Sequence, residues 1–383
     1  MKKIYSLAIL ILFYKTSAFS QNARFSQMWS APLQFNAALT GRFDGKMRIS
    51  NLNSWQNSND NSIGAASMQH QNIALDIKLG KYRSSGDEKV AVGEIKKVHS
   101  KDALGLRNKN RGYWGVGINY YHYGNDASAI DGKFFSTSLA RHFYNKSNKY
   151  YGLGGQLAFA QGNLNENRGS LFHYDKEISG GGFRTPLLSN RNINSLKLTA
   201  QKSYVDFNIG GYYGMITDAV LFELGFAMNH LFYPTNSFTN DSESKLRHRI
   251  SANSILRVKL NDKLGLVQKN MYWQEGLYLR SRSLNGDSTE IIAFWSGVEL
   301  YKINPIKKIN VNYGLYMRSF RTAIPYLNIN LDKFVNLRYS YEFPLNSKKY
   351  NAYSAKRNEL ALILSLERHT KPGTEFYKKI NFW

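Results

Sequence analysis

Strict alternation of apolar and polar residues, repeated in about fourteen segments, most constrains how this chain can fold. Leucine occupies every second position from 360 to 366, and the positions between carry Ala361, Ile363 and Ser365. The segment 220–229 has the same period. Successive side chains of a β-strand point to opposite faces, whereas a helix repeats every 3.6 residues. The pattern therefore predicts strands with one apolar face.

The predicted strands cover residues 46-55, 62-78, 113-123, 133-143, 150-161, 203-213, 219-230, 247-259, 264-280, 290-301, 308-317, 323-331, 334-343 and 358-367. Most of these segments have the length and dyad pattern of strands that cross an outer membrane. Lipid cannot satisfy an open sheet edge, so closure is required. We expect an all-β fold, a transmembrane antiparallel β-barrel of about 14 strands with a short N-terminal segment.

The N-terminus has the pattern of an export signal. Lys2 and Lys3 precede an apolar run at 4-14, and a small-x-small site at 18-20 follows. We expect a cleaved signal peptide at 1-20 and no transmembrane helix, because no later stretch has about twenty consecutive apolar residues. The predicted regions are the signal peptide at 1-20, an N-terminal segment at 21-44, the outer-membrane barrel at 45-368 and a C-terminal periplasmic tail at 369-383.

Composition excludes several classes of protein. The chain has no cysteine, so a lipoprotein anchor, a disulfide framework and a Cys-ligated metal site are excluded. Removing Lys2, Lys3 and Lys15 with the signal leaves 48 of the 51 Lys and Arg residues against 27 Asp and Glu, a formal charge of +21. This charge suits lipopolysaccharide or an anionic partner. Export and the lack of a nucleic-acid motif argue against nucleic acid.

Connection lengths predict how the barrel lies in the membrane. With an even number of strands both termini lie in the periplasm, and short turns alternate with longer outer loops such as 162-202. The exceptions are short outer loops at 56-61 and 318-322 and a long basic insertion at 79-112. The tail at 369-383 is compatible with a final β-signal, a disordered tail or a docking segment.

The start of the predicted mature chain carries a family-like motif. Phe25-Ser26-Gln27, then Ala31-Pro32-Leu33, then residues 36-41 resemble the opening of the PorP/SprF family of Bacteroidetes outer-membrane proteins. Ala37 stands where the family has proline. Other elements resemble the family in the same order along the chain: residues 51-55, 204-210, 225-234, 338-341 and 359-362.

The resemblance implies a role in type IX secretion and gliding motility. It implies a non-enzymatic barrel that anchors a partner surface adhesin, or assists its export, through the adhesin's C-terminal (type B) domain. Two alternatives stay open: a scaffold barrel linked to periplasmic ring components of the secretion apparatus, and a substrate-specific porin. The expected partners are therefore the adhesin, ring components, and outer-membrane lipid and lipopolysaccharide.

The family-like segment is predicted to form a plug or a periplasmic contact and so to bind the partner. The residues predicted for this role are Phe25, Ser26, Gln27, Trp29, Pro32, Leu33, Phe35, Asn36 and Gly41. Pro32 and Gly41 are expected to shape its turns.

No catalytic, cofactor or metal site is predicted. His70, His122 and His142 have no partner at metal-ligand spacing, and His230 is expected to be hydrogen-bonded near a barrel rim. Charged residues at inward positions are instead predicted to form a lumen network of ion pairs. They are Arg48, Asp206, Glu223, Glu299, Arg318, Arg338, Glu342 and Glu359.

Overall fold

The structure is a computed structural model that describes residues 25–43, 45–57, 68–79, 111–124, 130–144, 148–164, 201–217, 220–234, 246, 248–259, 272–281, 289–296, 300–301, 309–318, 322–331, 334–345 and 356–366. Several predictions fall outside these residues. They concern the signal peptide at 1-20, nearly all of the 79-112 insertion, most of the loop 162-202, Glu299 and the tail at 369-383.

Antiparallel strands make up nearly all of the described chain. They are β1 (Met47–Asn57), β2 (Met68–Leu79), β3 (Arg111–Gly124), β4 (Ile130–Tyr144), β5 (Lys149–Leu164), β6 (Gln201–Ile216), β7 (Val220–Asn229), β8 (Arg249–Lys259), β9 (Tyr272–Ser281), β10 (Thr289–Ser296), β11 (Leu300–Tyr301), β12 (Ile309–Arg318), β13 (Thr322–Leu331), β14 (Val335–Pro344) and β15 (Lys356–Leu366). Three short helical turns, η1 (Met28–Ser30), α2 (Pro32–Phe35) and η2 (Ala37–Leu39), precede β1.

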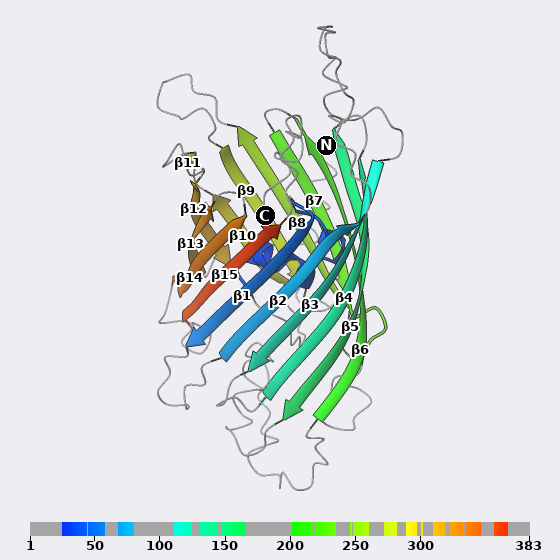
Figure 1. The fold of residues 1–383 in the computed structure, drawn as a ribbon. Coiled ribbons are helices and arrows are strands. Elements are labelled where there is room, and N and C mark those ends of the chain that lie inside the picture. Colours follow the sequence, from blue (N-terminus) through cyan, green and yellow to red (C-terminus); the bar gives the residue numbers. More distant parts are fainter. Residues whose placement is uncertain are drawn as a thin grey trace, which may run out of the picture.

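The strands pair mainly with their neighbours along the sequence, and β1 also pairs with β15. The two ends of the strand order meet because β10 pairs with β12, Ile292–Ser296 opposite Gly314–Arg318. The two-residue β11 pairs with another part of β12. Each long strand therefore has a partner on both sides, and the strands tilt around a common interior (Figure 1). The prediction of an antiparallel barrel is confirmed.

Alternation sorts the side chains of each strand between the two faces. In β15, Leu360 and Leu362 are 38% and 40% exposed, whereas Glu359 and Ala361 are 1% and 0% exposed. In β7, buried and more exposed residues alternate along the whole strand. The leucine face therefore points outward, as expected for a surface that meets lipid, and the polar face points into the barrel.

Some strands differ in length from the prediction. β5 reaches Leu164 and β6 spans Gln201–Ile216, so both are longer than predicted. Asn163 pairs with Gln201 although the side-chain pattern has lapsed there, because backbone hydrogen bonds define a strand. For β9 the described part is Tyr272–Ser281, and the predicted start at 264 lies outside the described ranges.

Residues 25–43, called here the inner segment, lie inside the ring of strands (Figure 1). All of them except Gln34 are buried. We call the end of the barrel where β1 begins the entry end and the opposite end the far end. The inner segment starts beside Glu359, near the far-end start of β15, and ends at Phe43 before β1. In the described chain, no helix is long and apolar enough to span a membrane.

Candidate functional site

The far-end anchor of the inner segment is the carboxylate of Glu359. Its two oxygens accept the backbone N–H groups of Ser26, at 2.7 Å, and Gln27, at 2.9 Å. The Gln27 side-chain amide donates to Ser340 Oγ at 2.8 Å and to the Glu359 backbone oxygen at 3.1 Å. Hydrogen bonds to a carboxylate are stronger than neutral ones. Glu359 thus fixes the chain direction where the segment begins.

A group of charged side chains surrounds this anchor. Ser26 Oγ donates to Glu342 at 3.1 Å and accepts from Arg318 at 2.7 Å. Glu342 lies 3.3 Å from Arg318 and 3.9 Å from Arg357. The hydroxyl of Ser26 therefore joins β12 and β14 to the inner segment, and Arg357 of β15 reaches this group through Glu342.

The middle of the inner segment is held through its backbone and amide groups. The Gln156 amide donates to the Leu33 backbone oxygen at 3.0 Å, and the Asn119 amide donates to Gln34 Oε1 at 3.0 Å. The amide of Asn36 donates to the Gly211 and Phe226 backbone oxygens, both at 3.3 Å. Specific polar contacts to β3, β5, β6 and β7 therefore fix the height of the segment in the lumen.

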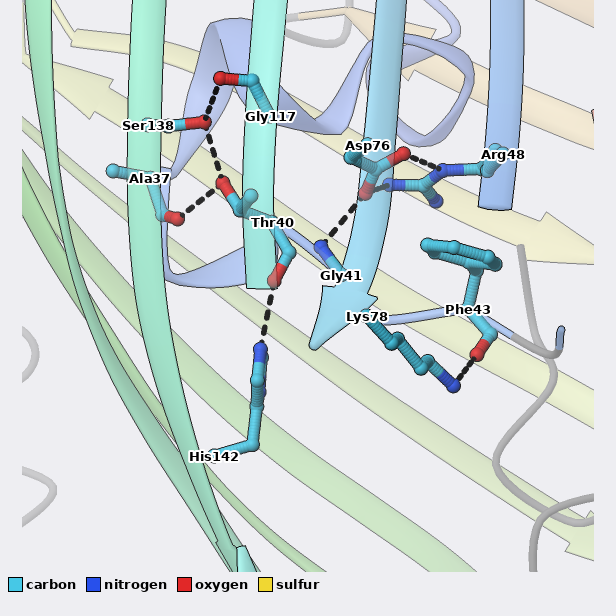
Figure 2. Close-up of polar contacts among 10 residues, drawn as sticks. All are labelled: Ala37, Thr40, Gly41, Phe43, Arg48, Asp76, Lys78, Gly117, Ser138 and His142. Carbon is cyan, nitrogen blue, oxygen red and sulfur yellow. Dashed lines mark hydrogen bonds and ion pairs between the residues drawn. The ribbon is translucent and has the colours of Figure 1, made fainter. Parts of the chain in front are cut away.

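Asp76 of β2 organises the entry-end anchor (Figure 2). Its carboxylate accepts the Gly41 N–H at 2.7 Å and binds Arg48 in a bidentate pair at 2.9 and 2.7 Å. The Thr40 hydroxyl donates to Ser138 Oγ at 2.8 Å, and His142 Nε2 donates to the Thr40 backbone oxygen at 2.7 Å.

An ion pair between Arg42 and Glu223 completes this anchor. Tyr150 donates a hydrogen bond to Glu223 at 3.0 Å, and the Arg42 guanidinium lies 4.5 Å from the centre of the Tyr212 ring. Burial alone lowers the pKa of Arg42, but the Glu223 carboxylate raises that pKa above its usual range. Arg42 therefore stays charged. The Lys78 ammonium donates to the backbone oxygen of Phe43 (Figure 2).

Glycines in the wall make room for the inner segment. A Cβ on Gly154 would lie 2.6 Å from the Ala37 backbone oxygen, and one on Gly115 would overlap the Thr40 backbone oxygen. Gly41, on the segment itself, has a φ of +74°, a conformation that favours glycine. The wall and the segment are thus fitted to each other at backbone level.

All nine residues predicted to bind a partner are buried in the interior of the barrel. Phe25 packs edge-on against Tyr121, with ring centres 5.8 Å apart, and Phe35 packs edge-on against Tyr278 at 5.4 Å. Pro32 begins α2. Leu33 packs close to Gly117 of β3, because a Cβ added to Gly117 would lie 3.0 Å from Leu33 Cδ1. The structure therefore places these side chains against the wall.

The predicted lumen charges divide into separate groups. Arg48 and Glu223 lie at the entry end, where Arg48 forms an ion pair with Asp76 and Glu223 forms one with Arg42. Four others surround the start of the inner segment or contact Ser30; they are Arg318, Glu342, Glu359 and Arg338. Asp206 instead pairs with His230 at 2.9 Å. Glu299 lies outside the described residues.

Several anchoring residues were not predicted. Arg42 and Thr40 lie in the N-terminal segment, and Asp76, Lys78 and His142 lie on strands. Asp76 shares a face with inward Ala74, so alternation could have identified it. The inward glycines were another signal, because a glycine face leaves space that another part of the chain must fill.

Each histidine that the structure describes contacts another group of the protein. His70 contacts the Tyr121 hydroxyl at 2.9 Å, and His122 contacts Asp131 at 2.6 Å. Among the residues that the structure describes, no group of three His, Asp or Glu side chains is arranged to hold a metal ion.

The solved structures that match this chain are distant from it in sequence. The toluene transporter TbuX of Ralstonia pickettii is 10% identical, with a TM-score of 0.43 over 86% of this chain and 90% of that chain. The toluene transporter TodX of P. putida is also 10% identical, with a TM-score of 0.42 over 88% and 93%. BamA from Haemophilus ducreyi is 11% identical, with a TM-score of 0.39 over 84% and 70%. No curated protein matches the chain.

A family model matches nearly the whole sequence. It is described as type IX secretion system membrane protein PorP/SprF, and the match covers residues 17–362. This range includes the inner segment with both of its anchors and all of the strands except the last four residues of β15. The chain therefore belongs to the PorP/SprF family of type IX secretion system membrane proteins.

Proposed function

We propose that this protein is a non-enzymatic outer-membrane barrel that binds and anchors a secreted surface adhesin, or assists its export, through the adhesin's C-terminal (type B) domain. The observation that carries the proposal is the inner segment, which is buried inside the barrel of a type IX secretion membrane protein. In an anchoring barrel the lumen need not stay open, whereas in a porin the segment would obstruct the path.

The contacts of the inner segment favour a fixed element over a loosely held one. A glutamate carboxylate accepts backbone N–H groups at the far end, and Asp76 does so at the entry end. Hydrogen bonds to charged groups contribute about 1.5–3 kcal/mol each. Several must break before the segment leaves, so we propose that it is a plug.

The nine residues predicted to bind a partner are all buried, which supports an indirect role for them. Side chains such as Phe25 and Leu33, each 1% exposed, have almost no surface to offer a second protein. We propose that they hold the plug and the barrel in the shape that the adhesin recognises. The long connections at the far end are the proposed contact surface, with that end facing outside.

The test is purification of an epitope-tagged copy from native outer membranes in mild detergent, followed by mass spectrometry. Recovery of a large adhesin with a C-terminal secretion domain is expected. Recovery of periplasmic ring components alone would favour the scaffold function. Recovery of the barrel alone, under conditions that preserve other complexes, would contradict anchoring and favour the porin.

A matched pair of glycine variants tests the role of the plug. Gly154 and Gly155 are adjacent on β5, but a Cβ on Gly154 meets Ala37 at 2.6 Å, whereas one on Gly155 makes ordinary contact with Phe207 at 3.5 Å. Gly154→Ala should reduce adhesin recovery, and Gly155→Ala should leave it unchanged. Both variants must still shift on gels upon heating, which shows that the barrel is folded.

A further inference from the structure

A small polar cavity lies between the inner segment and the wall, away from both anchors. Gln34 of α2 forms one side, and the inner faces of β4, β5 and β6 and the residues where β7 and β8 meet form the rest. Its charged residues are Asp206 and Arg249, each 5% exposed. Asp206 lies in the far-end half of β6 and Arg249 begins β8 at the far end, so the cavity belongs to the far-end half of the lumen.

Most polar groups around the cavity are already hydrogen-bonded. Gln156 Nε2 donates to the Leu33 backbone oxygen at 3.0 Å, and Gln156 Oε1 accepts from Asn208 at 2.9 Å. Asn208 Oδ1 accepts the His230 N–H at 3.2 Å, and His230 Nδ1 bonds Asp206 Oδ2 at 2.9 Å. These bonds hold the lining in place before any ligand enters.

Two lining groups keep unused hydrogen-bonding capacity. Asp206 Oδ1 and Arg249 Nη1 are buried without a hydrogen-bond partner among the described residues. With its amide oxygen turned towards Arg249, Asn229 accepts from Arg249 Nε at 3.1 Å. Arg249 Nη1 still has no acceptor among the described residues. A buried polar atom without a hydrogen-bond partner is costly, so a ligand that donates to Asp206 Oδ1 and accepts from Arg249 Nη1 would be stabilised in the cavity.

Charge balance favours a neutral ligand. The negative charge of Asp206 offsets the positive charge of Arg249 within the lining, and burial lowers the pKa of His230, which follows β7 outside the strands. An anion would face the Asp206 carboxylate, and a cation would face the Arg249 guanidinium. A hydroxyl both donates and accepts, so adjacent hydroxyls satisfy the two groups together.

We propose that this cavity binds the hydroxyl edge of a sugar ring. Its volume of about 30 Å³ holds roughly two water-sized groups, the size of a vicinal diol, and Phe134 and Ala158 supply an apolar wall beside them. The sugar is either free or part of a membrane glycan, and the proposal does not depend on the adhesin.

The test is calorimetric titration of the full-length protein in detergent with D-glucose, with D-mannose and with lipid-free core oligosaccharide from lipopolysaccharide. We expect saturable binding, and Arg249→Gln should weaken it by at least about tenfold because a charge-assisted hydrogen bond is lost. The matched control is Arg338→Gln, which removes a buried lumen arginine that contacts Ser30 instead. Binding of the oligosaccharide but not of the monosaccharides would assign the site to a membrane glycan.

A second variant keeps the test valid if Arg249→Gln does not fold. Ala158→Val narrows the cavity without removing a charge, and it should also weaken sugar binding. Three results would overturn the proposal: no sugar binding by the folded protein, sugar binding by both cavity variants that is as strong as that of the unaltered protein, or binding of acetate or glycine in place of sugars. Adhesin recovery from the same preparations is scored separately, so failure here leaves the anchoring proposal standing.

Discussion

Arg42 and Glu223, 181 positions apart in the chain, form an ion pair in which the two side chains are 2% and 0% exposed. The pair joins the inner segment to β7 just before the chain turns into β1. Removing two charges from water costs several kcal/mol, and mutual attraction with further hydrogen bonds offsets that cost. The pair therefore stabilises the inner segment only while both members are present.

Breaking this pair on one side is expected to destabilise the protein strongly. Arg42→Met leaves the Glu223 carboxylate buried with Tyr150 as its remaining donor in the described part of the chain, which should lower the free energy of unfolding by about 3–5 kcal/mol. Urea unfolding in detergent measures this loss. The double variant Arg42→Met with Glu223→Met should recover a large part of it, because no unpaired charge remains.

The control is Glu275→Gln, which alters an exposed glutamate that bonds Trp273. Its free energy of unfolding should change by less than about 0.5 kcal/mol. If Arg42→Met and the double variant lose the same stability, the two residues are not energetically coupled and the interpretation of the pair is wrong.

The variants Gly154→Ala and Gly155→Ala on β5 should differ in the ion conductance of the lumen. Gly154→Ala pushes a methyl group against Ala37, so the inner segment must shift from its place in the wall. We expect planar-bilayer recordings to show a raised or fluctuating conductance for Gly154→Ala and little conductance for the natural protein. Gly155→Ala should behave like the natural protein. A large, steady conductance in the unaltered protein would contradict the plug.

Sequence periodicity predicted the strands and their faces because the pattern is local. Glu359 and Leu360 are neighbours, and alternation alone assigns one to the interior and the other to lipid. Strand ends were less predictable, since pairs such as Asn163 with Gln201 depend on backbone bonds beyond the side-chain pattern.

The contacts of the inner segment could not be predicted in the same way. Phe25 to Gly41 was identified by resemblance, with its position left open between a plug and a periplasmic contact. Nothing near Arg42 in sequence indicates that Glu223 is its partner, because the contact depends on strand order, tilt and the height of the segment in the lumen. A single wall glycine that contacts the segment, such as Gly154, does not indicate this contact in the sequence; only several inward glycines together do so.

The far-end anchor predicts a local loosening when Glu359 is changed. Glu359→Gln replaces one acceptor oxygen by an NH2 group, which leaves the N–H of Ser26 or Gln27 buried without an acceptor. The expected cost is about 1–3 kcal/mol, concentrated at the start of the inner segment. Hydrogen exchange should accelerate over residues 25–31.

Exchange at the entry-end anchor, around Gly41, should change much less in the same sample, because Asp76 still holds that end. Equal acceleration at both ends would show that the segment is released as one unit. Glu275→Gln again serves as the control, with no change in either region.

The backbone and burial of His230 together predict a pH-dependent stability. His230 follows β7, has a φ of +63°, and its Nδ1–H donates to the Asp206 carboxylate at 2.9 Å. Burial lowers its pKa below the ordinary value of 6.5, so the folded protein favours the neutral ring. The unfolded chain then binds more protons as pH falls through about 6.5, and stability is lost towards lower pH.

His230→Asn should reduce this pH dependence, because asparagine accepts a positive φ and does not titrate. His230→Val should instead destabilise the protein at every pH, because a β-branched residue is strained at a positive φ. The measurement is the urea midpoint at about pH 7.5 and about pH 5.5, where His titration separates the two conditions. An unchanged pH difference in His230→Asn would assign the effect to other groups.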